Sequence, residues 1–182
     1  MDNKIDIFDS NEERLVYDWL FFLKEKGYII DFNKNIFDII EITSKIEKCN
    51  KKCVSLLRPW TYTYDFKIEW NLTAHNLFYN SVSENGKGYF ITNNNISYID
   101  VKGNYTRRNR VTDITFPLVQ KAVYHIHNIY IQKIVPIKLF LKLFATDDYL
   151  INDNVYKVGT NKGNNKFELK SFDQFINGFK QK

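Results

Sequence analysis

The sequence predicts a mixed α/β domain in which a central β-sheet is flanked by helices. Three observations favour this class. A segment with helical periodicity opens the chain, strand-like segments occupy its middle, and a second helical segment with one more strand follows them. No internal repeat or Pro/Gly-rich linker divides the 182 residues, a length that suits a single domain with a sizeable core.

The composition excludes several classes of protein. Hydrophobic residues make up 44% and aromatic residues 16%, with seven Gly and three Pro, so the chain is neither collagen-like nor wholly disordered. Two cysteines are too few for a disulfide-built secreted domain, and we expect them to be reduced thiols. The formal net charge of +5 permits a polyanionic partner such as nucleic acid without requiring one.

The sequence gives no sign of a targeting or membrane segment. Residues 1–9 lack the apolar stretch of a signal peptide. The longest apolar clusters, 19–23 and 135–145, are far shorter than the roughly 20 residues of a membrane-spanning helix. We therefore expect no membrane partner and a cytoplasmic protein.

The first predicted element is a helix over about residues 11–26. Ser10 is a suitable N-cap, apolar residues then recur at helical spacing, and Gly27 is suited to ending the helix. The segment 28–42 fits either a strand or a short helix. The polar segment 45–52 predicts a loop or exposed turn.

A series of strands occupies the middle of the chain. Aromatic and β-branched residues alternate with polar ones over 60–70, which predicts one strand. Further strands are expected at 77–82, 89–92 and 96–101, and the Asn-Gly pair within 83–88 predicts a turn. The expected core face of the first strand comprises Tyr62, Tyr64, Phe66, Ile68 and Trp70.

The next segments return to helical periodicity. A polar, basic loop is expected at 103–113, a helix with one apolar face at 116–129, and a short strand at 130–135.

The C-terminal part is harder to assign. Residues 137–143 are apolar and fit more than one element, while a strand is expected at 166–170 and a short helix at 172–179. We therefore divide the chain into a core, residues 1–136, and an extension, residues 137–182, packed on the same domain.

Two of the predicted strands each place an acid on a polar face. Asp65 belongs to the first, and Asp100 to another, where Lys102 shares its face because side chains alternate along a strand. If the strands are neighbours, the three charged groups converge. Two carboxylates suit a hard ion such as Mg²⁺, and a nearby lysine can orient an attacking water. This set of groups suits phosphodiester hydrolysis.

The strings Tyr-Thr-Tyr-Asp-Phe and Ile-Asp-Val-Lys-Gly, between an acid-bearing helix and a second helix, resemble the PD-(D/E)XK nuclease superfamily over roughly residues 10–135. The resemblance implies a restriction-endonuclease-like fold, with Mg²⁺ as cofactor and Mn²⁺ as a substitute. It implies Asp65, Asp100 and the Val101 carbonyl as metal ligands and Lys102 as the water-orienting residue.

Other positions of the pattern match in part. Glu13 corresponds to an acid on the first helix that helps catalysis by binding a second metal ion, and Gln120 to a polar residue near the substrate. Tyr64 stands where proline usually precedes the first Asp, and Asp100 where Glu is commoner.

Within the superfamily, the chain looks most like small phage endonucleases of the Holliday-junction-resolvase kind. This implies branched DNA as substrate, a role in DNA recombination, a bacterial or phage-infected host cell, and a homodimer, because two symmetric strands must be cut. The alternative is a catalytically inactive nucleic-acid-binding or virion-associated protein of the same fold.

Basic residues follow the candidate site. Arg107, Arg108 and Arg110 are expected to bind DNA phosphates, since arginines hold phosphate bidentately. Tyr105 is a candidate for stacking on a base. A second basic run, at 45–52, is expected to be solvated.

A rival placement of the motif exists in the C-terminal part. Glu168 and Lys170 also fit (D/E)-x-K, with Asp147, Asp148 or Asp153 as the first acid. No strong strand precedes that segment and no long helix follows it, so the placement at Asp65 and Asp100 is favoured.

A zinc site is the last alternative. Cys49, Cys53, His125 and His127 could supply four ligands, but their spacing differs from that of common zinc sites. The non-catalytic alternative is that Asp65, Asp100 and Lys102 are ordinary charges exposed on their strands.

Overall fold

The computed structural model describes residues 8–35, 38–81, 88–103, 110–147, 149, 155–160 and 163–180. Its centre is a four-stranded mixed sheet, which confirms the predicted mixed α/β class. The strand order is β1 (Ile29–Lys34), β6 (Phe66–Trp70), β9 (Ile96–Val101) and β10 (Ile131–Ile134). Strand β6 is antiparallel to both of its neighbours, β1 and β9, and β10 is parallel to β9.

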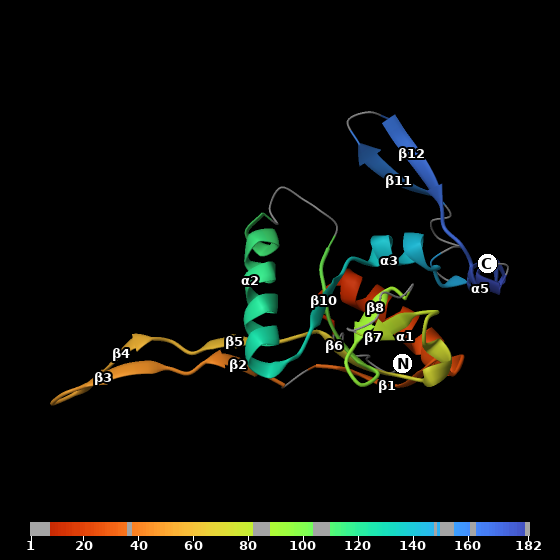
Figure 1. The fold of residues 1–182 in the computed structure, drawn as a ribbon. Coiled ribbons are helices and arrows are strands. Elements are labelled where there is room, and N and C mark those ends of the chain that lie inside the picture. Colours follow the sequence, from red (N-terminus) through yellow and green to blue (C-terminus); the bar gives the residue numbers. More distant parts are fainter. Residues whose placement is uncertain are drawn as a thin grey trace, which may run out of the picture.

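Helices cover both faces of this sheet (Figure 1). Helices α1 (Asn11–Glu25) and α3 (Pro136–Lys142) lie on one side, and α2 (Arg110–His127) lies on the other. A fourth helix, α5 (Phe172–Lys180), lies near the C-terminus. Helix α2 begins at Arg110, so the prediction of a loop reaching residue 113 is wrong at its end. Pro117 lies inside α2. The apolar pattern that predicts the helix begins only near this proline, at residue 116, and so misses the first turns of α2.

Helix α1 forms for reasons that its sequence displays. Ser10 caps it by accepting a hydrogen bond from the Glu13 N–H (3.2 Å). The helix buries a stripe at helical spacing that includes Val16, Trp19 and Leu23. Gly27 follows with φ +79°, a left-handed conformation that glycine adopts at little cost.

The larger hydrophobic core lies between the sheet and α1 with α3, and it is rich in aromatic rings. Trp19 is fully buried, its ring centroid lies 5.7 Å from that of Phe90 and 5.4 Å from that of Phe144, and its indole N–H donates to the Phe144 carbonyl (3.2 Å). Leu139 and Phe140 of α3 belong to the same core. Residues beyond 136 thus contribute to the main core, although the division at residue 136 itself stays a prediction.

A second, smaller core lies on the opposite face of the sheet, under α2. It combines Phe116 and Val123 of the helix with Ile131 of β10, Ile40 and Tyr64.

The prediction of a single strand over residues 60–70 is wrong. The chain forms β5 (Trp60–Tyr62), leaves the extended pairing at 63–65, and resumes as β6. This break turns Tyr64 toward the second core, whereas Phe66 and the following apolar residues of β6 face the first.

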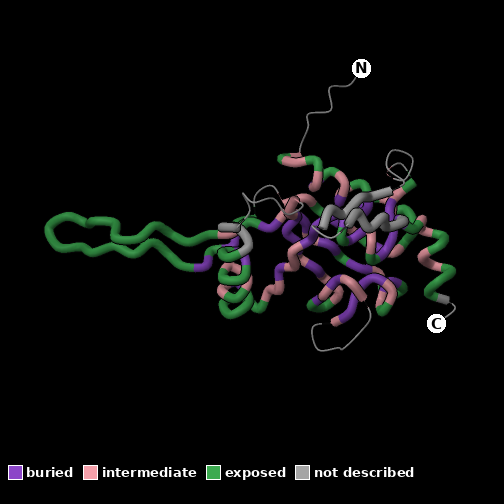
Figure 2. The backbone as a smooth tube through the Cα atoms, turned by 90° about the horizontal axis from the view of Figure 1, so that it is seen from above, coloured by how far each residue is buried: buried purple, intermediate pink, exposed green. Residues whose placement is uncertain are grey.

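The connection between β1 and β6 is a long two-stranded arm. Its base pairs β2 (Ile40–Thr43) with β5, and its outer part pairs β3 (Ile46–Cys49) with β4 (Cys53–Leu57), both antiparallel. Figure 2 shows the arm projecting from the body with its backbone almost wholly exposed. The prediction of a loop or exposed turn at 45–52 is confirmed for the exposed turn at 50–52 and wrong for Ile46–Cys49, which form β3.

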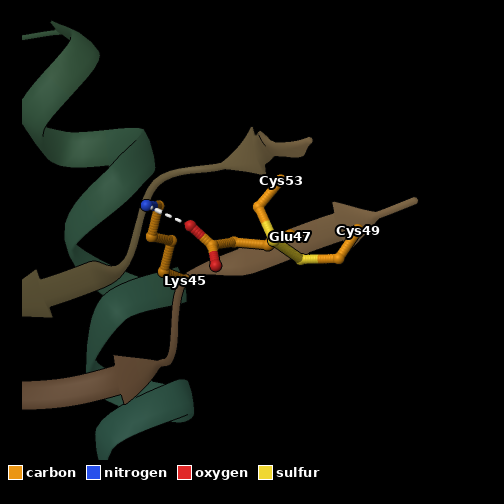
Figure 3. The surroundings of a disulfide bond; sticks show 4 residues. All are labelled: Lys45, Glu47, Cys49 and Cys53. Atoms are coloured by element: carbon orange, nitrogen blue, oxygen red, sulfur yellow. Dashed lines mark ion pairs between the residues drawn. A yellow bond between two sulfur atoms is a disulfide. The ribbon is translucent and has the colours of Figure 1, made fainter. Parts of the chain in front are cut away.

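Cys49 and Cys53 form a disulfide near the end of the arm (Figure 3), so the expectation of reduced thiols is wrong. The two residues are paired across the β3–β4 ladder, so it is the hairpin that brings their sulfur atoms together. Cysteine binds zinc as a free thiolate, which a disulfide does not offer. The alternative zinc site with His125 and His127 therefore loses two of its four ligands. Glu47 lies beside the disulfide, but bonded sulfurs make this group a poor metal site.

The remaining elements are short. Strands β7 (Tyr79–Ser81) and β8 (Phe90–Thr92) pair in parallel after a 3₁₀ turn, η1 (Leu72–Ala74), and the Asn-Gly turn predicted at 83–88 lies almost entirely outside the described residues. Strands β11 (Val155–Thr160) and β12 (Gly163–Glu168) form a separate hairpin. In the part of the chain that the structure describes, no helix combines the length and the apolar character needed to cross a membrane.

Candidate active site

The site forms where β6 and β9 run side by side. Phe66 pairs with Ile99 in an antiparallel register, so Asp65, one residue before Phe66, is carried next to Asp100, one residue after Ile99. The backbone N–H of Val101 donates to Oδ2 of Asp65 over 2.6 Å, which ties the Asp65 side chain to β9. The structure thus brings together the two acids that the sequence places on separate strands.

Lys102 completes this group. Its ammonium nitrogen lies 2.7 Å from Oδ1 of Asp100, as expected for residues two apart on one face of a strand. The backbone N–H of Lys102 donates to the Ile134 carbonyl (2.8 Å), which extends the pairing of β9 with β10. The Asp100 side chain is only 3% exposed and that of Lys102 is 32% exposed, so the lysine reaches from solvent to a buried carboxylate.

The electrostatics of Asp65 show how close the two carboxylates lie. Burial, followed by the negative charge of Asp100, raises the pKa of Asp65 from 3.8 to about 7. The hydrogen bond from Val101 and the charge of Lys102 act in the opposite direction, and Glu13 adds a smaller increase. The charge of Lys102 therefore does not offset burial and the repulsion from Asp100 at the Asp65 carboxylate.

Tyr62, at the end of β5, is a member of the site that sequence reasoning missed. Burial and the nearby charges of Asp100 and Asp65 raise the pKa of its hydroxyl. Among the described residues, neither the Tyr62 hydroxyl oxygen nor Oδ2 of Asp100 has a hydrogen-bond partner of good geometry, although both atoms are buried. The Tyr62 hydroxyl is nevertheless close enough to Asp100 for a hydrogen bond to that carboxylate to contribute to the raised pKa. A buried carboxylate oxygen without a well-aligned donor marks a place where a cation would be accommodated.

Lys133 is a second residue that the sequence did not indicate. Strand β10 pairs it with Asp100, and paired residues of neighbouring strands share a face of the sheet. A strand register cannot be read from the spacing of residues 100 and 133 along the chain, and the alternation over 60–70 predicts Tyr62 on the core face of a continuous strand. Neither residue had a sequence signal of its own.

The first turn of α1 lies against the end of β9. A Cβ atom added at Gly103 would lie 3.1 Å from Oε1 of Glu12, which shows how closely the helix approaches. Glu13 is 7% exposed and its Oε2 lies 3.0 Å from the Lys34 ammonium, while its other oxygen accepts from the Ser10 hydroxyl (3.3 Å). Glu13 therefore contributes to the helix cap and, through its charge, to the site.

Gln120 has a structural contact. Its side-chain N–H donates to the backbone carbonyl of Ile131 over 2.6 Å, which joins α2 to the beginning of β10. Ile131 pairs with Tyr98, two residues before Asp100 on β9. Gln120 thus lies on the α2 side of the sheet, and its proposed position near a substrate stays a prediction.

The expected DNA-binding residues fall largely outside the described residues. Arg107, Arg108 and Tyr105 lie in the gap before α2, and only the backbone of Arg110 is described, as the first residue of α2. In the rival motif, Lys170 is exposed and the side chain of Glu168 is not described.

The groups of the site fit a hard divalent cation. Asp65 and Asp100 offer carboxylate oxygens, of which Oδ2 of Asp100 is buried and has no well-aligned donor among the described residues, and their mutual repulsion would be relieved by a positive ion. The Val101 carbonyl and Glu13 are the further oxygen donors that the sequence proposes for the ion.

Comparison with known proteins supplies no family for this chain. No family model, no curated protein and no solved structure matches it. Its function therefore has to be argued from the site and the fold.

Proposed function

We propose that the protein is a Mg²⁺-dependent endonuclease that hydrolyses DNA phosphodiester bonds. The observation that carries the proposal is a pair of neighbouring carboxylates, the buried Asp100 and the half-buried Asp65, in which partial burial and the charge of Asp100 raise the pKa of Asp65 to about 7, with Lys102 beside them. Strongly perturbed acids next to a lysine are common at catalytic sites.

The arrangement of the fold supports the same proposal. Along the chain, α1, β1, β6, β9, α2 and β10 follow one another, and the four strands keep this order in the sheet. Glu13 lies on the first helix, Asp65 directly before β6, and Asp100 and Lys102 at the end of β9. This is the order of acid-bearing elements for which the chain resembles PD-(D/E)XK nucleases, and we propose a restriction-endonuclease-like fold on that basis.

Each group of the site has a definable task. Asp65, Asp100 and the Val101 carbonyl would hold Mg²⁺, for which Mn²⁺ can substitute. When bound, the ion supplies positive charge that offsets the charge developing on the phosphate and its leaving oxygen. Lys102, partly exposed at the mouth of the site, orients the attacking water and stabilises negative charge. Glu13 is positioned to assist from the start of α1.

The biological setting belongs to the proposal as well. We propose branched DNA as substrate, a role in phage DNA recombination, a homodimer for paired cuts, and the cytoplasm of a bacterial or phage-infected cell. A reducing cytoplasm favours thiols over the disulfide between Cys49 and Cys53. Trapping free thiols in freshly lysed cells reports directly on that setting.

The test is a cleavage panel with purified protein. Linear, nicked, flapped and four-way DNA are incubated with Mg²⁺, Mn²⁺ or EDTA, using the wild type, Asp100→Asn and Lys102→Met. We expect metal-dependent cleavage by the wild type and a loss of at least about 100-fold in each variant. Glu69→Gln is the matched control, since Glu69 is an exposed acid on β6, four residues beyond Asp65.

The outcomes separate the proposal from its alternatives. Cleavage that survives both site substitutions would locate the activity elsewhere, on a contaminant or on another site. Binding of DNA without cleavage of any substrate would favour the alternative function, a catalytically inactive nucleic-acid-binding or virion-associated protein of the same fold.

A further inference from the structure

The outer part of the arm makes no contribution to either hydrophobic core. Every residue from 43 to 61 is exposed, and Figure 2 shows this stretch extending well beyond the body. Two strands, a disulfide and a tight turn are thus maintained at a distance from the rest of the molecule. Core packing therefore does not explain why the chain forms this exposed ribbon.

The charge of the chain is concentrated on this ribbon. We call residues 45–58 the arm tip. It carries five basic side chains and one acidic one, a net charge of +4, whereas the whole chain has +5. The rest of the protein is therefore almost balanced. The charged residues of the arm tip are Lys45, Glu47, Lys48, Lys51, Lys52 and Arg58.

The register gives the arm tip two different faces. On one, Lys45 forms an ion pair with Glu47 near the disulfide (Figure 3). On the other, the ladder pairs Ile46 with Leu57 and Lys48 with Val54. The three apolar side chains of this second face are 48%, 60% and 58% exposed, in the order Ile46, Leu57 and Val54. An apolar strip next to Lys48 therefore remains open to solvent.

We propose that the arm tip binds duplex DNA, with its lysines on the phosphates and the strip of Ile46, Val54 and Leu57 against the groove. A two-stranded ribbon fits the major groove, where apolar side chains can contact the methyl group of thymine. Phosphates complement the net charge of +4, whereas the arm tip of a second copy of this chain would repel it.

The arm also leads directly to the candidate active site. Strand β5 returns from the arm tip and ends at Tyr62, whose hydroxyl is next to Asp100, and Asp65 follows three residues later. A duplex held on the arm is thereby connected to the site by a short stretch of chain. In this respect the inference rests on the proposed nuclease function, which it supplies with a substrate-binding element.

The test measures DNA binding in EDTA, where cleavage does not occur. Fluorescence anisotropy of a labelled duplex compares the full-length wild type with the triple variant Lys48→Gln, Lys51→Gln, Lys52→Gln. The control carries three exposed lysines changed in the same way elsewhere, at Lys138, Lys142 and Lys170. Both variants lose the same charge, and none of these lysines belongs to the site.

We expect the arm variant to bind roughly 10- to 100-fold more weakly at about 0.1 M salt, and its slope of log K against log salt to fall by about 3. The control should stay within about twofold of the wild type. Equal losses in both variants would overturn the proposal, since they would reflect net charge alone. A change of oligomeric state in the arm variant, with DNA binding intact, would overturn it in favour of a second copy as occupant.

Failure of this inference and failure of the proposed function are distinguishable. Arm-dependent binding without any cleavage supports the inference and removes the nuclease. Metal-dependent cleavage with unchanged binding by the arm variant supports the nuclease and removes the arm as its DNA-binding element.

Discussion

Replacing Asp65 with Asn is expected to stabilise the metal-free protein at neutral and alkaline pH. The raised pKa means that the folded protein holds a proton on Asp65 up to about pH 7, whereas the unfolded chain loses it near 3.8. Ionisation of Asp65 therefore opposes folding as the pH rises through this window. Asn is neutral at every pH, and its side-chain oxygen can still accept the hydrogen bond from the Val101 N–H.

The size of the effect follows from the two pKa values. Each unit of difference corresponds to about 1.4 kcal/mol, so the change from 3.8 to about 7 represents roughly 4 kcal/mol once both states are ionised. At about pH 8 and without metal, the Asp65→Asn variant should thus be more stable by roughly 3–4 kcal/mol. Toward pH 4 the difference should become small, since the wild-type carboxyl is then protonated when folded.

The assay is urea denaturation in EDTA at a series of pH values, with Glu69→Gln as a control on an exposed acid of β6. The free energy of unfolding of the wild type should fall between acidic and neutral pH more steeply than that of Asp65→Asn. Equal stabilities at about pH 8, or a less stable Asn variant, would refute the reasoning, because Asp65 would then not be a destabilising charge.

Two further predictions concern the arm and the first helix. The double variant Cys49→Ser, Cys53→Ser should change the midpoint of global thermal unfolding by less than about 2 °C, because the disulfide lies outside both cores. Trypsin should cleave the arm tip of this variant faster than that of the wild type. A large drop in the midpoint would contradict this prediction. Glu13→Gln should slow cleavage and lose roughly 2–3 kcal/mol of stability, because it removes the charge opposite the mostly buried Lys34 ammonium, and Glu13→Ala should lose about 1 kcal/mol more through the helix cap. Equal cleavage by the Gln variant and the wild type would show that Glu13 acts only as a cap.

The parts of the fold that local patterns determine were predictable. Helix α1 has a cap, an apolar stripe and a terminating glycine in its own sequence, and β9 spans 96–101, as its alternation predicts. Because the side chains of a strand alternate, the shared face of Asp100 and Lys102 followed from their spacing. The proximity of Asp65 required only that the two strands be neighbours, as they are.

The parts that depend on tertiary contacts were not predictable. The break between β5 and β6 does not interrupt the aromatic alternation over 60–70, and only the presence of two cores on opposite faces explains why Tyr64 turns away from Phe66. The outer part of the arm is a different case, since β3 and β4 bury nothing and leave no alternation that marks a core. Without the hairpin register, Cys49 and Cys53 could not be recognised as a disulfide pair.

The measurement that tests the central claim most directly is the location of a bound divalent cation. A crystal soaked in Mn²⁺ and measured at a wavelength where manganese scatters anomalously shows where the ion lies. We predict an anomalous peak between the carboxylates of Asp65 and Asp100, which is absent in Asp100→Asn. A peak confined to other residues, or no peak at a Mn²⁺ concentration that supports DNA cleavage, would contradict the assignment of these two acids as the metal site of a nuclease.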